Sequence, residues 1–146
     1  MRRTVAAFVF LIGLLSAGPA AAGPEEDATA VRRNIEQTFN AKNWDGLIGL
    51  YTGAFQYWGV GKSELIVSPD ALRAYFSSLS PDLKIEMGEH SVIQIAPDTL
   101  LSAGFAVVTS SNRSNPPAVL RLTIVMANVD GRWLIAQYHA SLMPKA

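Results

Sequence analysis

The sequence contains no cysteine and only two histidines among its 146 residues, and 16% of the residues are charged. Without cysteine there is no disulfide and no thiolate nucleophile, so an apolar core has to hold the fold together. Two histidines also leave too few of the usual ligands for a zinc-type centre, and we expect neither a metal nor a cofactor. Nor does the sequence carry a nucleophile elbow, a phosphate-binding loop or a dinucleotide fingerprint. The sequence therefore gives no support to the common hydrolase, phosphotransferase and dehydrogenase designs.

The apolar run near the N-terminus, Thr4–Leu15, is too short to span a bilayer, which takes roughly 20 residues. It follows Arg2 and Arg3 and precedes the small residues Ala20–Ala22. This order is typical of a secretory signal peptide. An uncleaved membrane anchor is the alternative, and the shortness of the run argues against it. We predict that residues 1–22 are a signal peptide and that the protein is periplasmic or secreted.

Cleavage after Ala22 would leave 124 residues with ten basic and twelve acidic side chains, a net charge of −2. Such a chain has no excess positive charge to attract nucleic acid or an anionic membrane, so we expect neither a nucleic-acid partner nor stable membrane insertion. Its length and its apolar content fit one domain with a real core. Mass spectrometry of the exported protein should find Gly23 as the first residue, and a chain that begins at Met1 would contradict cleavage.

The first half of this domain shows signals for three helices and one strand. A proline followed by three acidic residues predicts a helix over 24–43, with apolar residues at helical spacing. Asp45 can cap a short second helix. Ala54–Val60 is rich in aromatics and predicts a strand. Ser68-Pro69 is an N-cap followed by proline and predicts a third helix, which Ser80-Pro81-Asp82 ends.

The second half reads as four strands separated by turn signals. Their expected ranges are 83–95, 99–110, 118–129 and 132–142. Helices first and a run of strands afterwards indicate an α+β fold. We predict a cone-shaped, curved antiparallel sheet with the three N-terminal helices packed on one face.

Two turns compete at Asp130-Gly131, the last hairpin. A two-residue turn pairs Val129 with Arg132, and a three-residue loop pairs Asn128 with Arg132. The three-residue loop sets Arg121 opposite His139 and Thr123 opposite Gln137, and it gathers Leu120, Leu122, Ile124, Met126, Leu134, Tyr138 and Leu142 on the other face. The two-residue turn would place Arg121 among apolar side chains, where an unpaired guanidinium is costly. The sequence therefore favours the three-residue loop.

Both faces of the predicted sheet nevertheless carry large apolar residues. A sheet that is hydrophobic on both sides needs a cover on each side. The helices can cover one face, and a second copy of the chain is the simplest cover for the other. We therefore expect a homodimer formed through the sheet.

Several local motifs resemble a known family. They are Phe39–Trp44 with Leu50-Tyr51, Phe55–Gly61, Asp70–Phe76, and near the C-terminus Arg121–Val125, Asp130–Ile135 and His139–Ser141. In this order they resemble SnoaL-like domains of the nuclear-transport-factor-2-like superfamily, over roughly residues 28–144. The association domains of calcium/calmodulin-dependent kinases are similar at the C-terminus.

The resemblance implies a SnoaL-like domain over 23–146, a cone-shaped half-barrel with a pocket between sheet and helices, and usually a dimer. One departure concerns the residues beside His139. An aromatic residue or a second histidine is common there, and this chain has Tyr138 and Ala140. The shape of the pocket or of the interface is expected to differ accordingly.

Two residues near the C-terminus are the main candidates for ligand contacts. Arg121 interrupts an apolar strand, and its guanidinium could bind a carboxylate in a cavity. The alternative is a structural salt bridge to Glu64 or Glu86. His139 could serve as a base or a ligand donor, and the alternative is a hydrogen-bonded core histidine.

Four further residues complete the candidate ligand-binding set. Thr123 and Gln137 share the predicted face with Arg121 and His139. Tyr57 and Trp58 are neighbours in a strand and point to opposite faces, so only one of them can line a pocket.

These features lead to three functional hypotheses. The first is an exported, dimeric, non-catalytic domain that binds a small, mostly apolar ligand with a polar or anionic end, met by Arg121 and His139. The second, on the resemblance, is an isomerase, dehydratase or cyclase. That chemistry needs a base in the pocket, so Asp45 or Glu64 would have to lie near His139. The third is a pure assembly module, favoured if side chains fill the cone.

Overall fold

The computed structural model describes residues 22–61, 63–112 and 114–144 and contains three helices and five strands. The elements are α1 (Pro24–Asn40), α2 (Trp44–Ile48), β1 (Tyr51–Trp58), α3 (Pro69–Ser77), β2 (Lys84–Ala96), β3 (Thr99–Thr109), β4 (Ala118–Val129) and β5 (Arg132–Leu142). Residues 1–21 of the predicted signal peptide lie outside the described residues. None of the helices in the described part combines the length and the apolar character needed to cross a membrane.

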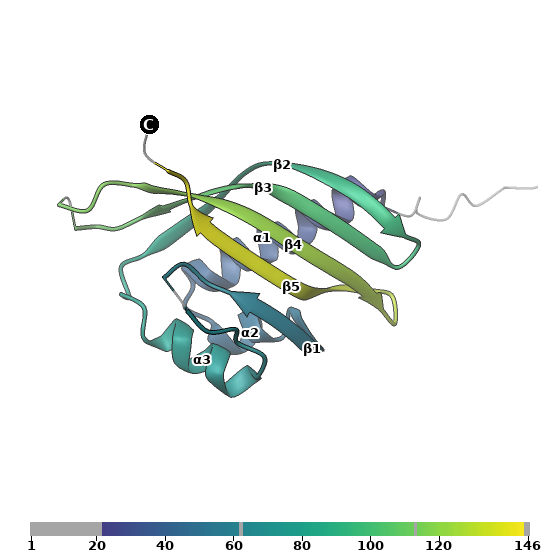
Figure 1. The fold of residues 1–146 in the computed structure, drawn as a ribbon, viewed down its shortest axis with the longest axis horizontal. Helices are drawn as coiled ribbons and strands as arrows, with labels where there is room; N and C mark the ends of the chain where they lie inside the picture. The colour runs from purple at the N-terminus through teal and green to yellow at the C-terminus, as the bar shows by residue number, and fades with distance from the viewer. Residues whose placement is uncertain (1–21, 62, 113, 145–146) are drawn as a thin grey trace, which may run out of the picture.

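The five strands form one curved sheet in the order β1-β5-β4-β3-β2. Strands β2 to β5 pair in antiparallel fashion, and β1 joins the edge of β5 in parallel. Helix α1 crosses one face of the sheet, and α2 and α3 lie near β1 (Figure 1). The predicted α+β fold is confirmed, with one correction: the sheet is mixed. The connection from β1 passes through α3 and three further strands before β5 returns beside it.

The helix signals predicted starts better than ends. Helix α3 begins at Pro69 as expected, and the side chain of Ser68 accepts a hydrogen bond from Ala71 N. Helix α1 ends at Asn40 rather than near residue 43, because Lys42 adopts a left-handed φ of 56°. The Asn40 side chain is engaged with strand β2 instead, donating to Ile85 O at 2.8 Å and accepting from Ile85 N at 2.9 Å.

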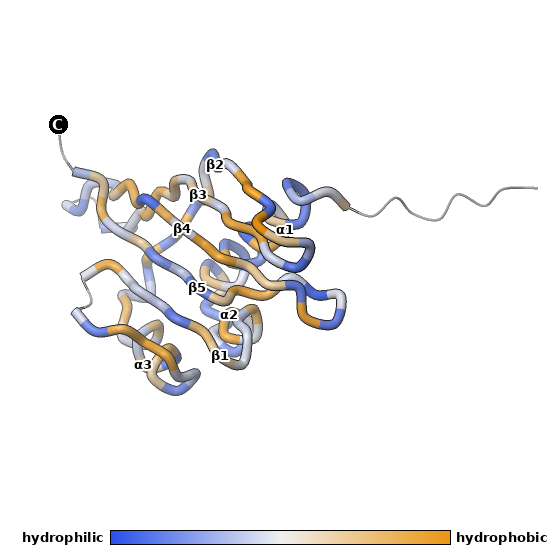
Figure 2. The backbone as a smooth tube through the Cα atoms, turned by 45° about the vertical axis from the view of Figure 1, so that its right-hand side comes forward, coloured by the Kyte–Doolittle hydropathy of each residue, from blue (hydrophilic) through white to orange (hydrophobic). Residues whose placement is uncertain are grey.

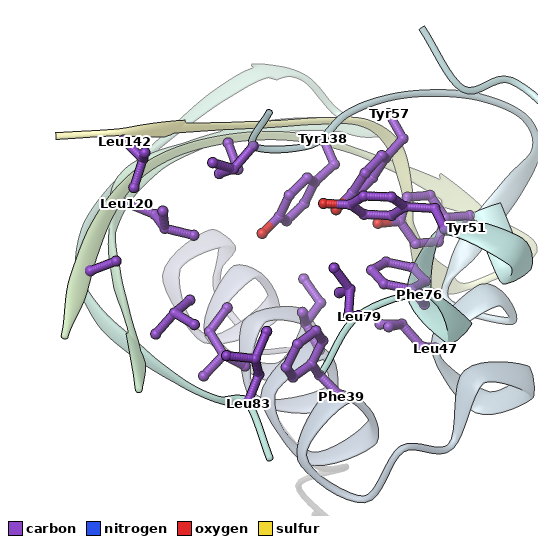
Figure 3. A pocket seen from close by; sticks show the side chains of 17 residues that line it. Phe39, Leu47, Tyr51, Tyr57, Phe76, Leu79, Leu83, Leu120, Tyr138 and Leu142 are labelled. Atoms are coloured by element: carbon purple, nitrogen blue, oxygen red, sulfur yellow. The ribbon is translucent and has the colours of Figure 1, made fainter. Parts of the chain in front are cut away.

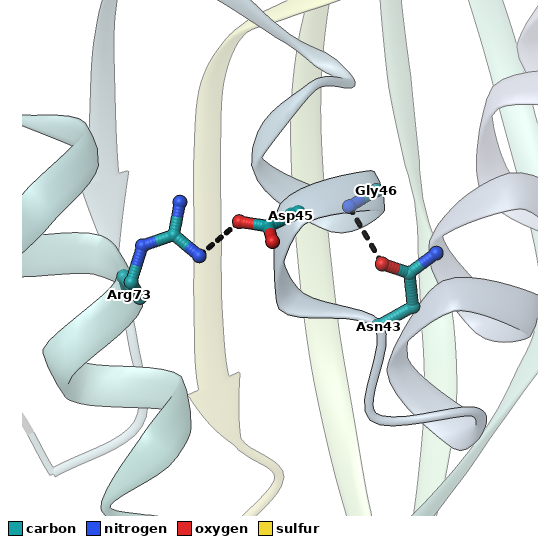
Figure 4. Close-up of polar contacts among 4 residues, drawn as sticks. All are labelled: Asn43, Asp45, Gly46 and Arg73. Atoms are coloured by element: carbon teal, nitrogen blue, oxygen red, sulfur yellow. Dashed lines mark hydrogen bonds and ion pairs between the residues drawn. The ribbon is translucent and has the colours of Figure 1, made fainter.

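The cap of α2 was predicted wrongly. Asn43 is the cap: its Oδ1 accepts from Gly46 N at 2.9 Å. Asp45 lies inside α2 and forms an ion pair with Arg73 of α3, which ties the two short helices together (Figure 4). Strand β1 also begins earlier than expected, at Tyr51 rather than Ala54.

The turn of the last hairpin has two residues, so the predicted three-residue loop is wrong. Asp130 and Gly131 have φ values of 52° and 81°, as a two-residue primed turn requires, and Val129 pairs with Arg132. A β-bulge then follows in β5, where Met126 pairs with Ile135 and Val125 with Gln137. The bulge inserts one extra residue and reverses the face of everything beyond it.

The bulge therefore restores the predicted separation of faces over most of the hairpin. Thr123 lies opposite His139 and Arg121 opposite Ser141, two residues away from the predicted partners but with the same faces. Near the turn the faces differ from the prediction. Ile135, expected with the polar set, is fully buried against Met126.

The core lies between α1 and the inner face of the sheet. Helix α1 contributes Val31, Ile35 and Phe39, and alternate positions of β4 contribute Leu120, Leu122, Ile124 and Met126. Much of β4 is hydrophobic along its length, whereas the turn that joins it to β5 is largely hydrophilic (Figure 2). The apolar residues spaced at the helical repeat on α1 thus pack against those spaced at the strand repeat on β4, and together they form one apolar layer.

Asp82 fastens the loop before β2 to the end of β3. Its carboxylate accepts hydrogen bonds from the hydroxyls of Ser110 and Ser80, and from Ser111 N at 3.0 Å. The hydrogen bond from Ser110, followed by that from Ser80, holds the pKa of Asp82 well below its usual range. This connection holds the segment before β2 close to the end of β3.

Candidate functional site

A cavity of about 270 Å³ lies between the inner face of the sheet and the three helices. Its 17 lining residues come from every helix and from all five strands or the loops beside them (Figure 3). They are Ile35, Phe39, Leu47, Tyr51, Tyr57, Val60, Tyr75, Phe76, Leu79, Leu83, Ile85, Val108, Ala118, Leu120, Tyr138, Ala140 and Leu142. The cone is therefore hollow rather than filled by side chains.

Local structure explains why these side chains point inward. Ile35 and Phe39 are four residues apart on α1 and share its buried face. Successive residues of a strand point to opposite faces, and Leu120 on β4 and Ala140 on β5 both point to the inner face of the sheet. The side chain at position 140 is a single methyl group, which leaves open the space that a larger residue would fill.

The floor near β1 is an aromatic cluster. Tyr57 stacks on Tyr138, with ring centroids 5.1 Å apart and planes 9° apart, and it packs against Tyr75 at 5.5 Å. Phe76 stacks on Trp44 of α2 at 5.6 Å. The hydroxyl of Tyr138 points into the open space of the cavity (Figure 3).

Tyrosine hydroxyls supply the polar groups of the lining. Burial raises the pKa of Tyr51 and of Tyr57 well above the usual value for a phenol, and it raises the pKa of Tyr75 and of Tyr138 as well. These phenols are therefore neutral over the physiological pH range and can donate hydrogen bonds. Among the described lining residues none is a carboxylate, a histidine, a lysine or an arginine.

The predicted site residues are divided between the two faces of the sheet. Tyr57 is buried and lines the cavity, whereas its neighbour Trp58 faces the other way, as predicted for this pair. Arg121 and His139 are exposed on the outer face, at strand positions between inward-facing neighbours. The expectation that these two groups meet a ligand inside the cavity is corrected, because the helices, and with them the cavity, lie on the opposite face of the sheet.

The structure does bring several of the predicted residues together on that outer face. His139 pairs with Trp58 on one side and with Thr123 on the other, and Gln137 pairs with Val125. Arg121 is two residues from Thr123 on the same face of β4. Among the described residues it forms no ion pair with Glu64 or Glu86, so the structural alternative proposed for it is not realised there.

The residues that sequence reasoning missed are mainly Tyr138, Tyr75 and the aliphatic lining. A signal for two of them was present: Tyr138 and Ala140 are the positions that depart from the family pattern beside His139, and both line the cavity. Tyr75 lies in α3, and its ring packs on Tyr57 and Phe76. Hydropathy alone does not distinguish a core side chain from one that borders a hollow.

The outer face of β2, β3 and β4 carries a second notable feature, an exposed apolar surface. Ile93 and Ile95 are each 60% exposed and Phe105 is 43% exposed, and Val119 lies on the same face. Large exposed apolar patches mark interaction sites. Within the described part of the chain no element of the protein itself covers this surface.

Comparisons with known proteins identify a matching family model and several solved structures with a similar fold. A family model described as the SnoaL-like domain matches residues 29–145. A protein from Xanthomonas campestris, described as a calcium/calmodulin-dependent protein kinase II association domain, is 22% identical, with a TM-score of 0.77 over 89% of this chain and 95% of that one.

Two further solved structures are similar. A nuclear-transport-factor-2-like protein with a cystatin-like fold from Novosphingobium aromaticivorans is 13% identical, with a TM-score of 0.73 over 84% of each chain. A ketosteroid isomerase-like protein from Erwinia carotovora is 20% identical, with a TM-score of 0.66 over 83% of this chain and 98% of that one. At these identities the likeness shows the fold alone. No curated protein matches the chain.

Proposed function

Because the chain belongs to the SnoaL-like domain family, we propose that it is a binding protein whose inner cavity holds a small, mostly apolar organic molecule. The observation that carries this proposal is the hollow of about 270 Å³, lined by aliphatic and aromatic side chains. Apolar cavities with a few placed polar groups are the usual form of small-molecule sites. The neutral hydroxyl of Tyr138, which points into the cavity, would donate a hydrogen bond to an oxygen of the ligand.

The chemistry of the lining favours binding over catalysis. An isomerase, dehydratase or cyclase needs a base in contact with its substrate. His139 lies on the other face of the sheet, and the described lining holds no carboxylate. Asp45 is paired with Arg73 at the surface between α2 and α3. A pure assembly module is also less well supported, since such a module has no need of an empty interior.

Filling the cavity should weaken binding strongly without unfolding the protein. Ala140→Phe would place a phenyl ring in the space that the methyl group leaves open. The ring should displace a part of the ligand about as large as three to four methylene groups. Because burying each methylene contributes about 0.8 kcal/mol, the affinity should fall about a hundredfold. Fluorescence titration with the neutral probe N-phenyl-1-naphthylamine measures the effect.

The matched control is Ala30→Phe, which makes the same change at an exposed position of α1. It should bind the probe like the wild type. Equal binding by wild type and Ala140→Phe would show that the probe does not enter the cavity, and absence of binding by the wild type would contradict the proposed function.

We also propose that the protein is a homodimer, with the outer face of β2, β3 and β4 as the interface. Support comes from the exposed Ile93, Ile95 and Phe105, which share a face whose central strands carry few charges. A two-fold axis would bring this surface against its own copy, so that each chain covers the other. Analytical ultracentrifugation at micromolar concentration should give the mass of two chains.

The proposal that the protein is exported rests on the sequence of residues 1–22. Basic, apolar and small residues follow one another there in the order of a secretory signal. Under this proposal, the mature protein is a ligand-binding domain without cysteine in the periplasm or outside the cell.

A further inference from the structure

Arg32 is a buried cation within the core of the domain. It lies on α1 and its side chain is 2% exposed. Its Nη2 donates to Phe105 O at 2.9 Å and to Gly88 O at 3.2 Å. Both carbonyls belong to the bulge at which Gly88 and Glu89 of β2 lie opposite Phe105 of β3. The contact therefore connects the helix to an irregularity of the sheet.

Half of this guanidinium remains without a partner. Nη1 of Arg32 is buried and makes no hydrogen bond, and among the described residues no carboxylate lies within ion-pair distance. A guanidinium stays charged at physiological pH even where burial lowers its pKa, as it does here. A buried positive charge without a counter-charge is costly, and such groups are normally paired.

The nearest titratable neighbours do not supply the missing negative charge. His90 bonds Thr29 at 3.3 Å, and its pKa is lowered, first by burial and then by Arg32, which keeps its imidazole neutral. Glu36 is one helical turn from Arg32, but its Oε2 accepts from Met87 N at 2.8 Å. Tyr138 is a neutral phenol, as described above.

Arg32 is not one of the lining residues, but it lies between elements that line the cavity. Ile35, less than one helical turn further along α1, lines the cavity, and so does Ile85, three residues before Gly88 on β2. Tyr138 lines it too and is within electrostatic reach of the guanidinium, whose charge partly opposes the rise that burial causes in the pKa of the phenol. A ligand end group beside the Tyr138 hydroxyl would thus be close enough to Arg32 to feel its charge.

We propose that the ligand of the cavity carries a carboxylate, or a similar oxyanion, that extends past the Tyr138 hydroxyl to pair with Nη1 of Arg32. This inference rests on the proposed function and specifies the ligand class: a small apolar carboxylic acid rather than a neutral lipid or terpene. Arg32 would be the residue that determines this specificity. The same guanidinium would keep its two backbone contacts to the bulge while it bound the anion.

The test compares decanoate with decanol, which have the same ten-carbon chain and differ in the charge of the end group. Both are titrated at pH 8 as competitors of N-phenyl-1-naphthylamine. The wild type should bind decanoate at least tenfold more tightly than decanol. Arg32→Met should remove this preference and leave the affinity for decanol within twofold, and the exposed neighbour Arg33→Met should preserve the preference.

The outcomes separate the two proposals. If neither compound displaces the probe, the proposed function fails and this inference fails with it. If decanol binds as well as decanoate, or if Arg32→Met keeps the preference, this inference is refuted and the proposed function stands.

A second measurement covers the case that Arg32→Met does not fold. Decanoate labelled with ¹³C in the carboxyl group is titrated by NMR while bound to the wild type. A carboxylate beside the guanidinium should show a pKa below that of the free acid, whereas one held by apolar groups alone should show a raised pKa and would overturn the inference.

Discussion

Replacing Gly104 by alanine should lower the free energy of unfolding by about 3 kcal/mol, near the upper end of what overpacking costs. Gly104 lies opposite His90, where the bulge of β2 brings the two strands unusually close. A Cβ atom on Gly104 would be 2.3 Å from the carbonyl oxygen of Glu89 and 2.6 Å from Cβ of His90. Because the nearer obstacle is backbone, no rotation of a side chain can relieve the clash.

Denaturant unfolding followed by circular dichroism measures this loss. Gly53→Ala is the matched control, since Gly53 is also a strand glycine and a Cβ there would meet nothing within 4 Å. It should change the stability by less than about 0.5 kcal/mol. Equal stabilities of the two variants would mean that the bulge yields easily and that the close approach of the strands is not rigid.

Phe105→Lys should convert the protein to a monomer at micromolar concentration. Phe105 lies on the outer face of β3 at the centre of the exposed apolar surface, beside Arg121 of the next strand. A lysine in a dry interface would leave an unpaired ammonium, and in a two-fold interface it would do so twice. We expect the dissociation constant of the dimer to rise about a hundredfold or more, as at the centre of other interfaces.

Sedimentation equilibrium of wild type and variant reports this change, and circular dichroism confirms that the fold is kept. Ala74→Lys introduces the same charge on the exposed side of α3, away from the sheet, and should remain dimeric. A monomeric wild type would remove the dimer proposal, and a dimeric Phe105→Lys would move the interface to another surface.

Local signals in the sequence were sufficient to predict features that depend only on residues nearby in the chain. Ser68 before Pro69 sets the start of α3, because a cap needs only the next turn of backbone. The bounds of β4 and β5 follow from the turn residues on each side of them. The prediction that Tyr57 and Trp58 point to opposite faces of β1 was also correct.

Features that depend on residues far apart in the chain were harder to predict from the sequence. Helix α1 ends early, at Asn40, and the side chain of this last residue bonds Ile85, 45 residues away in the sequence. The register of the last hairpin came out with the right faces but the wrong turn, since the bulge in β5 offset the error in loop length. The candidate site was displaced for a different reason: a polar stripe in a strand shows which residues share a face, but not which face the helices cover.

The sequence by itself determined the α+β class, the order of the elements, the division of β4 and β5 into an apolar and a polar face, and the signature of the family. These follow from the periodicity of side chains along helices and strands, which neighbours in the chain impose. Only the tertiary structure decided that α1 to α3 cover the face with Tyr138 rather than the face with His139, and that one guanidinium of α1 is buried beside a bulge. Both depend on how the sheet curves and where its strands gain a residue, and those are properties of long-range packing that no local pattern encodes.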